Sequence, residues 1–127
     1  MPRLDAVAVT TTNMAKSVAF YEMLGFTFGD WGAEDQHVEP VVEDGEVRLM
    51  IDTAELLEKF TGARPTPPNH SSFAMRCDDP AEVDAIAARM SQAGYALTVA
   101  PWDAFWGQRY ATVVDPDGYQ IDLFAPL

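Results

Sequence analysis

The chain repeats one order of motifs, and this internal repeat limits its possible folds more than any other feature. Residues 4–9 (LDAVAV) and 71–77 (SSFAMRC) are short apolar segments of the kind that form strands. Each precedes a segment with helical spacing of apolar residues that ends at a glycine, Gly25 in the first half and Gly94 in the second. The repeat therefore predicts two copies of a strand followed by a helix.

Capping residues indicate where the two helices begin. Asn13 precedes the first helical segment, and Asp79 precedes the second, in which Pro80 takes the first helical position. A further strand is expected after each helix, over residues 26–31 and 95–102, and a tryptophan is the last residue of each. Each half thus returns from helix to strand.

An Asp-Gly dipeptide closes each half. The first hairpin is expected over residues 37–51, with its turn at the Asp-Gly pair 44–45. The second is expected over residues 108–124, with its turn at the Asp-Gly pair 117–118. Asp-Gly between two strand-like runs is one of the strongest short-range hairpin signals. The predicted order is therefore β-α-β-β-β, twice, which makes an α+β fold.

The repeat also predicts the domain organisation. A single domain is expected over residues 1–127, with a first module at about 3–52 and a second at about 70–125. The linker between them, about 53–69, begins with a short helical piece at 53–60. Three prolines and a glycine then prevent regular structure before the second module begins.

The composition excludes two classes of partner. The chain has 20 acidic and 8 basic residues, a net charge of −12, whereas nucleic acids and anionic membranes both require a basic surface. A negative field is compatible with a cationic ligand. The apolar runs are too short to span a bilayer and no signal peptide is recognised, so a cytoplasmic protein is expected. Cys77, the only cysteine, excludes a disulfide framework within one chain and is expected to be buried.

Three stretches resemble the vicinal oxygen chelate superfamily, which includes glyoxalase I, extradiol dioxygenases and bleomycin-resistance proteins. They are SVAFYEMLGF (17–26), NHSSFAMRCDD (69–79) and, above all, FWGQRYATVVDPDGYQIDLF (105–124). The resemblance implies two βαβββ modules that form a half-open cup, with the helices outside and a pocket on the concave side. It also implies a homodimer.

The resemblance further implies a metal site with four ligand positions in the enzymatic members, on the first and last strands of each half. In this chain the first-strand positions fall at Ala6 and His70, and the last-strand positions fall at Leu49 and Asp122. Two protein ligands are too few for a tight zinc or nickel site, because catalytic zinc generally takes three. We therefore expect neither a metal nor another cofactor.

Metal-free members of the superfamily resemble antibiotic-binding proteins that sequester a drug and do no chemistry. The expected partner is an aromatic small molecule, with a cationic antibiotic as one candidate, and aromatic rings would stack on it with about 0.5–1.5 kcal/mol per pair beyond area burial. Arg109 is expected to pair elsewhere, because it alternates with Tyr110 on one strand. The candidate ligand-binding residues are Trp31, His37, Glu39, Arg48, His70, Trp102, Phe105, Trp106, Tyr110 and Asp122.

Two other functions remain open at this point. The first is a metal-dependent lyase, isomerase or dioxygenase that uses His70, Asp122 and a third ligand such as Glu46 or His37. The second is a binding protein that also assists a metal-free reaction, with His70 or Glu39 as general base. Measuring the metal content of the purified protein distinguishes the metal-dependent enzyme from a drug-binding protein. An assay for turnover distinguishes the metal-free reaction from binding alone.

Overall fold

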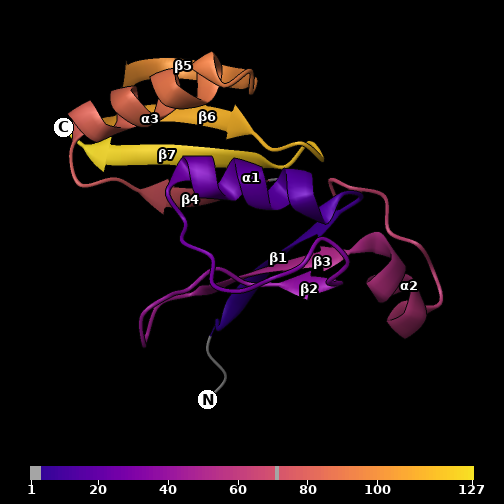
Figure 1. Ribbon diagram of the computed structural model, residues 1–127. Coiled ribbons are helices and arrows are strands. Elements are labelled where there is room, and N and C mark those ends of the chain that lie inside the picture. Colours follow the sequence, from indigo (N-terminus) through magenta and orange to yellow (C-terminus); the bar gives the residue numbers. More distant parts are fainter. Residues whose placement is uncertain (1–3, 71) are drawn as a thin grey trace. The chain divides into compact units, whose positions relative to one another are not determined.

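The computed structural model describes residues 4–70 and 72–127, which form two compact units that meet in sequence between Asn69 and His70 (Figure 1). Each unit has its own β-sheet, and the three helices and two sheets confirm the predicted α+β class. Within the described residues, no helix is both long enough and apolar enough to cross a membrane.

The first unit contains a three-stranded sheet. Its strands are β1 (Ala6–Thr11), β2 (His37–Val38) and β3 (Arg48–Thr53), and they lie in the order β1-β3-β2. β1 runs parallel to β3, and β2 runs antiparallel to it. Alternate residues of β3 face opposite sides, so Leu49 and Ile51 are buried while Arg48 and Met50 are half-exposed.

The helix α1 (Met14–Leu24) begins and ends where the sequence predicts. Asn13 is the N-cap, and its side-chain oxygen accepts a hydrogen bond from the Lys16 backbone nitrogen at 3.1 Å. Gly25 ends the helix with φ at 122°, a conformation that side chains with a Cβ rarely adopt. The buried side chains of α1 include Val18, Phe20, Tyr21 and Leu24, and α1 packs against β3.

The strand predicted over residues 26–31 is absent, so the first unit is β-α-β-β rather than β-α-β-β-β. One ladder-like bond does form here, from the Val41 nitrogen to the Thr27 oxygen at 2.7 Å. It cannot propagate through Pro40, which has no N–H to donate. The prediction was wrong because a strand needs a neighbouring strand to pair with, and residues 26–31 have none among the described residues.

The first hairpin is shorter than predicted. The pairing of β2 with β3 joins only His37 to Asp52 and Val38 to Ile51. The predicted turn is present beyond this ladder: Gly45 has φ at 88°, and the Glu46 nitrogen donates to the Glu43 oxygen at 3.1 Å. The Asp-Gly signal thus gave the turn correctly and overstated the length of the strands.

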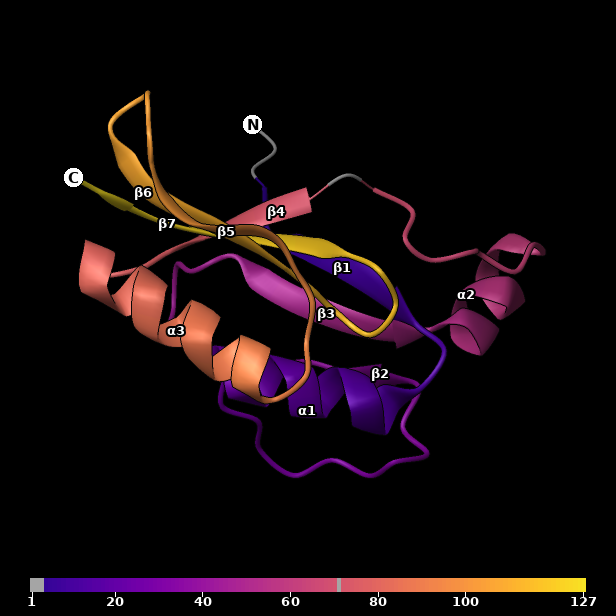
Figure 2. The same ribbon diagram turned by 90° about the horizontal axis from the view of Figure 1, so that it is seen from above.

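The helix α2 (Ala54–Thr61) confirms the short helix predicted at the start of the linker. Thr53 caps it by accepting a hydrogen bond from the Leu56 nitrogen at 3.2 Å. Figure 2 shows α2 beyond the end of β3, to which it is joined directly. Only Ala54 of this helix is buried.

The second unit has the full β-α-β-β-β order. Its elements are β4 (Ser72–Arg76), α3 (Pro80–Gln92), β5 (Leu97–Ala104), β6 (Gln108–Val114) and β7 (Gln120–Pro126). The sheet order is β4-β7-β6-β5, so the last strand lies between the first strand of the unit and β6 (Figure 1). Ser71, part of the predicted strand 71–77, lies outside the described residues.

Asp115 organises the turn of the second hairpin at the predicted Asp-Gly pair. Its side-chain oxygen Oδ1 accepts hydrogen bonds from the backbone nitrogens of Asp117 and Tyr119, each at 2.9 Å. Gly118 takes φ at 95°. Asp115 is buried, and these bonds supply the partners that a buried carboxyl group requires.

Candidate functional site

Four aromatic side chains gather at the β5–β6 hairpin of the second unit, and we call them the aromatic cluster: Trp102, Phe105, Trp106 and Tyr110. Trp102 stands directly across from Tyr110 in the ladder between β5 and β6. Phe105 and Trp106 occupy the connection between these strands, which Gly107 turns with φ at 92°. Strand pairing and a tight turn therefore bring together residues that the sequence places eight positions apart.

The rings of the aromatic cluster touch edge to face. Trp106 lies 5.4 Å from Trp102, 5.0 Å from Phe105 and 5.3 Å from Tyr110, measured between ring centroids, with interplanar angles of 80–89°. This is a favourable geometry for aromatic pairs. The indole N–H of Trp106 donates to Gln108 at 2.8 Å, so its polar atom already has a partner.

The aromatic cluster is exposed to solvent. Phe105 is 91% exposed, Trp106 49% and Trp102 38%. Single exposed apolar residues are normal on a protein surface, whereas contiguous apolar patches mark sites of interaction. The cluster therefore presents ring faces that a flat ligand or another apolar surface could cover.

Asp122 of β7 adjoins the aromatic cluster. Tyr110 donates its hydroxyl hydrogen to Oδ2 of Asp122 at 2.5 Å, and Thr112 donates to Oδ1 at 2.8 Å. Burial and the bond to Asp122 raise the pKa of Tyr110 to about 12. Tyr110 is thus a neutral hydrogen-bond donor over the whole neutral range, and Asp122 is the negative charge beside the rings.

Arg109 points to the other side of β6, as predicted from strand alternation. Its Nε donates to Asp84 of α3 at 2.8 Å, and its Nη1 donates to Asp103 of β5 at 3.1 Å. The pKa of Arg109 is raised, chiefly by the bond to Asp84. Arg109 therefore ties α3 to the sheet and does not belong to the cluster.

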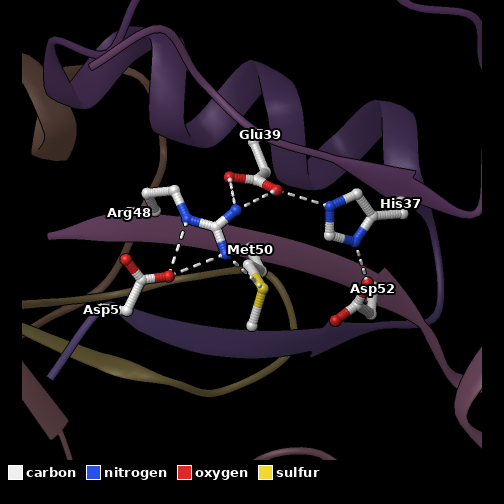
Figure 3. A network of polar contacts seen from close by, with 6 residues as sticks. All are labelled: Asp5, His37, Glu39, Arg48, Met50 and Asp52. Carbon is white, nitrogen blue, oxygen red and sulfur yellow. Dashed lines mark hydrogen bonds and ion pairs between the residues drawn. The ribbon is translucent and has the colours of Figure 1, made fainter. Parts of the chain in front are cut away.

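In the first unit, His37 lies between two carboxylates (Figure 3). Its Nδ1 is 2.5 Å from Asp52 Oδ1, and its Nε2 is 2.7 Å from Glu39 Oε2. A ring that donates from both nitrogens is an imidazolium. The hydrogen bonds to Glu39 and then to Asp52 raise the pKa of His37 above its ordinary 6.5.

Arg48 continues the same chain of charges (Figure 3). Its Nη1 is 3.2 Å from both oxygens of Glu39, and its Nη2 is 3.1 Å from Asp5. We call the five residues Asp5, Arg48, Glu39, His37 and Asp52 the charge chain. Its acids and bases alternate, so each cation lies between two carboxylates.

Trp31 joins His37 and Glu39 around a hollow of about 120 Å³ in the first unit. Phe28, Asp30 and Asp35 contribute to the same lining. A larger hollow of about 520 Å³ lies near the starts of α1 and α2, and none of the predicted site residues lines it. The structure thus groups the predicted residues of the first unit at the smaller hollow and along the charge chain.

His70 is exposed and lies against two aromatic rings of the second unit. Its ring centroid lies 4.5 Å from that of Tyr119 and 6.3 Å from that of Phe73, in tilted arrangements. These contacts lie beside the first residues of β4 and do not involve Asp122. The ring of His70 therefore takes part in aromatic packing at the start of the second unit.

The donor atoms of this chain do not fit the metal site that the superfamily implies. Both oxygens of Asp122 accept hydroxyl hydrogens, and both nitrogens of His37 face carboxylates. Leu49 is buried on the opposite side of β3 from Arg48 and Met50, and its side chain has no donor atom for a metal. Within residues 4–70 and 72–127, no group of three or more His, Cys, Asp or Glu side chains could hold a metal ion.

Sequence reasoning missed four members of these networks. They are Asp5, Met50 and Asp52 in the first unit and Thr112 in the second. A period of two was the available signal: Arg48, Met50 and Asp52 alternate along β3, as Tyr110 and Thr112 do along β6. Applied to both strands, this period would have placed Met50 beside Arg48 and Thr112 beside Tyr110, and it would have put Asp52 on the same face as Arg48 without showing that it pairs with His37.

Comparison with known proteins identifies the class. The family described as the Glyoxalase/Bleomycin resistance protein/Dioxygenase superfamily matches residues 3–123, and the chain belongs to it. A glyoxalase-related enzyme from Fulvimarina pelagi has a similar structure, with a TM-score of 0.84 and 18% identity over 98% of this chain and 88% of that one. A lactoylglutathione lyase from Agrobacterium tumefaciens gives a TM-score of 0.73 and 18% identity over 98% of this chain and 94% of that one. At these identities the likeness establishes the fold alone.

A shorter similarity exists to a curated protein. Laccase abr2 from Aspergillus fumigatus is 33% identical over 73 residues, which is 55% of this chain. The match spans only 12% of the laccase, so it carries no conclusion about activity.

Proposed function

We propose that this protein binds and sequesters an aromatic small molecule, without a metal and without changing it, and that antibiotic resistance is the biological setting. The observation that carries the proposal is the exposed aromatic cluster, in which Phe105 is 91% exposed beside two further half-open indole rings. Stacking on such rings contributes about 0.5–1.5 kcal/mol per pair beyond the area buried.

Charge favours a cationic ligand at this position. The carboxylate of Asp122 lies next to Tyr110, and the chain as a whole carries a net charge of −12. A negative field concentrates cations at the surface and raises their association rate. A planar cation would therefore meet stacking surfaces and a carboxylate together.

The metal-free part of the proposal rests on the donor set described above. The oxygens of Asp122 and the nitrogens of His37 are already engaged by protein partners. A metal-dependent enzyme, such as a lyase, is the competing assignment within the same superfamily. It requires His37 to turn a ring nitrogen away from a carboxylate, and it requires Asp122 to bind a metal with oxygens that already accept two hydroxyl hydrogens.

The test is a fluorescence titration of the purified protein with metal-free bleomycin and a panel of flat aromatic antibiotics. Saturable tryptophan quenching is expected at a fixed stoichiometry, with the ligand recovered unchanged by mass spectrometry. Phe105→Ala should weaken binding by roughly 2- to 12-fold, the equivalent of one stacked pair. Phe60→Ala is the matched control, because Phe60 is also a highly exposed phenylalanine, at 77%, and lies on α2.

Three outcomes would overturn the proposal. The first is the absence of saturable quenching by any member of the panel. The second is equal weakening in the Phe105→Ala and Phe60→Ala variants. The third is near-stoichiometric transition metal in protein purified without a chelator, which would restore the metal-dependent assignment.

We also propose that the protein is a homodimer, and light scattering tests this separately. If Phe105→Ala converts a dimer to a monomer, the aromatic cluster is a subunit contact and not a ligand platform. If the oligomeric state is unchanged while quenching weakens, the cluster binds the ligand.

A further inference from the structure

The strand β2 has few backbone contacts to hold it. Its ladder with β3 consists of two residue pairs, His37 with Asp52 and Val38 with Ile51. One flanking bond adds to this, from the Thr53 nitrogen to the Gln36 oxygen at 2.9 Å. The side-chain bridge from His37 to Asp52 lies across the same pair, so it contributes directly to the attachment of β2 (Figure 3).

The two contacts of His37, with Asp52 and with Glu39, can be made together only when His37 is charged. Both ring nitrogens lie within 2.7 Å of carboxylate oxygens, and both can donate only when the ring is an imidazolium. A neutral ring has one N–H, so one carboxylate would then face a lone pair at hydrogen-bonding distance. The charged groups around the ring are Asp52 and Arg48 on β3, Glu39 next to β2, Asp5 beyond Arg48, and Asp30 and Asp35 at the hollow.

The structure indicates which contact fails when the proton leaves. The side chain of Asp52 is 10% exposed, whereas that of Glu39 is 26% exposed. Glu39 also accepts from Arg48 through both of its oxygens. A neutral His37 therefore donates its single N–H to Asp52, because that carboxylate has less access to water. Glu39 keeps its hydrogen bonds to Arg48.

Loss of the contact between His37 and Glu39 changes the hollow beside Trp31. His37, Glu39 and Trp31 all line this space of about 120 Å³, and residues 28–39 supply the whole lining. The contact between His37 and Glu39 joins two of its lining residues. When it opens, the cross-link between His37 and Glu39 is lost, and the segment keeps the contact to Asp52, the short ladder with its flanking bond, and the pair between Glu39 and Arg48.

We propose that His37 is a proton-controlled latch: the imidazolium fixes residues 28–39 around the hollow beside Trp31, and loss of its proton opens that hollow. The latch is a property of the first unit and does not depend on ligand binding by the aromatic cluster. Because the hydrogen bonds to Glu39 and Asp52 raise the pKa of His37, the latch stays closed below pH 6.5 and opens as pH rises through a midpoint above that value.

The experiment uses the full chain with Trp102→Phe and Trp106→Phe, which leaves Trp31 as the only tryptophan. Acrylamide quenching of Trp31 is measured between about pH 5.5 and 9, a range in which histidine ordinarily titrates. Cysteine ordinarily titrates there too, but burial raises the pKa of Cys77 to about 11. Acrylamide is neutral, so the protein field does not alter its access. A sigmoidal rise in quenching is expected, with its midpoint above 6.5.

Three variants assign the transition. His37→Gln should abolish the pH dependence, and Asp52→Asn should move the midpoint down, because it removes one of the two carboxylates that hold the proton. His70→Gln is the matched control, since His70 is the only other histidine, and the transition should persist in it. A flat profile, or a transition lost in His70→Gln and kept in His37→Gln, overturns the proposal.

A second measurement avoids the tryptophan substitutions. Proton NMR of the unmodified protein follows both histidine rings through the same range, with His70→Gln giving the assignment. A His37 midpoint above 6.5, with coincident shifts of the Trp31 indole, supports the latch. A midpoint at or below 6.5, or an indole signal that does not move with it, overturns it.

Discussion

Tyr110 and Asp122 are joined by a hydrogen bond that runs diagonally across two strands, with 2.5 Å between the phenol oxygen and the carboxylate. They do not face each other in the ladder: Tyr110 stands opposite Phe124, and Asp122 stands opposite Thr112. The diagonal reach places the aromatic cluster and a negative charge in one connected group. Asp122 accepts a second hydrogen bond from the hydroxyl of Thr112, so its carboxylate joins two side chains of β6.

A double-mutant cycle measures this bond. Tyr110→Phe removes the donor and should lower the free energy of unfolding by about 1–2 kcal/mol, because hydrogen bonds to charged groups exceed neutral ones and this pair is half-buried. In the Asp122→Asn background, Tyr110→Phe should lower the free energy of unfolding by a smaller amount. Urea unfolding of the four proteins gives the coupling energy. Additive effects, within about 0.3 kcal/mol, would show that the bond contributes nothing.

The raised pKa of Tyr110 predicts a change at alkaline pH. Its pKa of about 12 lies above the ordinary 10.0, so the folded protein holds this proton where the unfolded chain releases it. The stability from Tyr110 is therefore complete below about pH 10 and is lost as pH rises toward 12. Tyrosinate absorbance should show an ionisation near pH 12 whose amplitude falls by one tyrosine in the Tyr110→Phe variant. An unchanged amplitude near pH 12 in the variant contradicts the assignment.

Asp115 should be among the costliest acidic residues to replace. Its side chain accepts two backbone hydrogen bonds in the second hairpin while buried, so Asp115→Ala leaves two N–H groups without partners and should cost about 2–4 kcal/mol. Asp115→Asn retains an acceptor oxygen and should cost less. Thermal or urea unfolding provides the measurement, and Asp44→Ala, at the exposed Asp-Gly turn of the first unit, is the control. Equal stability of Asp115→Ala and Asp44→Ala would refute the role.

Cys77 should be unreactive in the folded protein. It is buried, and burial followed by the nearby Glu82 and Asp78 raises the pKa of its thiol to about 11. The thiolate is the reactive form, so very little is present at pH 8. Reaction with a disulfide reagent such as DTNB should be slow without denaturant and complete in guanidinium. Rapid stoichiometric labelling of the folded protein would contradict this environment.

The sequence predicted those parts of the fold that local chemistry determines. Asn13, Asp79 and Pro80 gave the helix starts, Gly25 gave a helix end, and each Asp-Gly pair lies in a turn. Helix caps and tight turns are determined by interactions within a few residues, so they can be predicted from the local sequence. The missing strand at residues 26–31 shows the limit, because a strand also requires a partner that Pro40 cannot supply.

The candidate site was predicted less completely, for a related reason. Trp102, Phe105, Trp106 and Tyr110 were proposed together and lie together, because the turn at Gly107 brings both strands back on each other. Asp52 was missed, although it bonds to His37, because the two lie 15 residues apart. Such a pairing follows from the register of β2 against β3, which a short and irregular hairpin does not reveal in advance.

The place of β7 in its sheet has a consequence for how the chain is made. β4 pairs only with β7 in its sheet, although residues 77–119 separate the two strands in sequence. During synthesis, β4 therefore emerges well before its partner and has no strand to pair with until residues 120–126 have been made. A nascent chain halted before residue 120 would expose an unpaired strand, which is the kind of surface that chaperones bind. For the second unit, completion of the sheet must wait for the synthesis of β7.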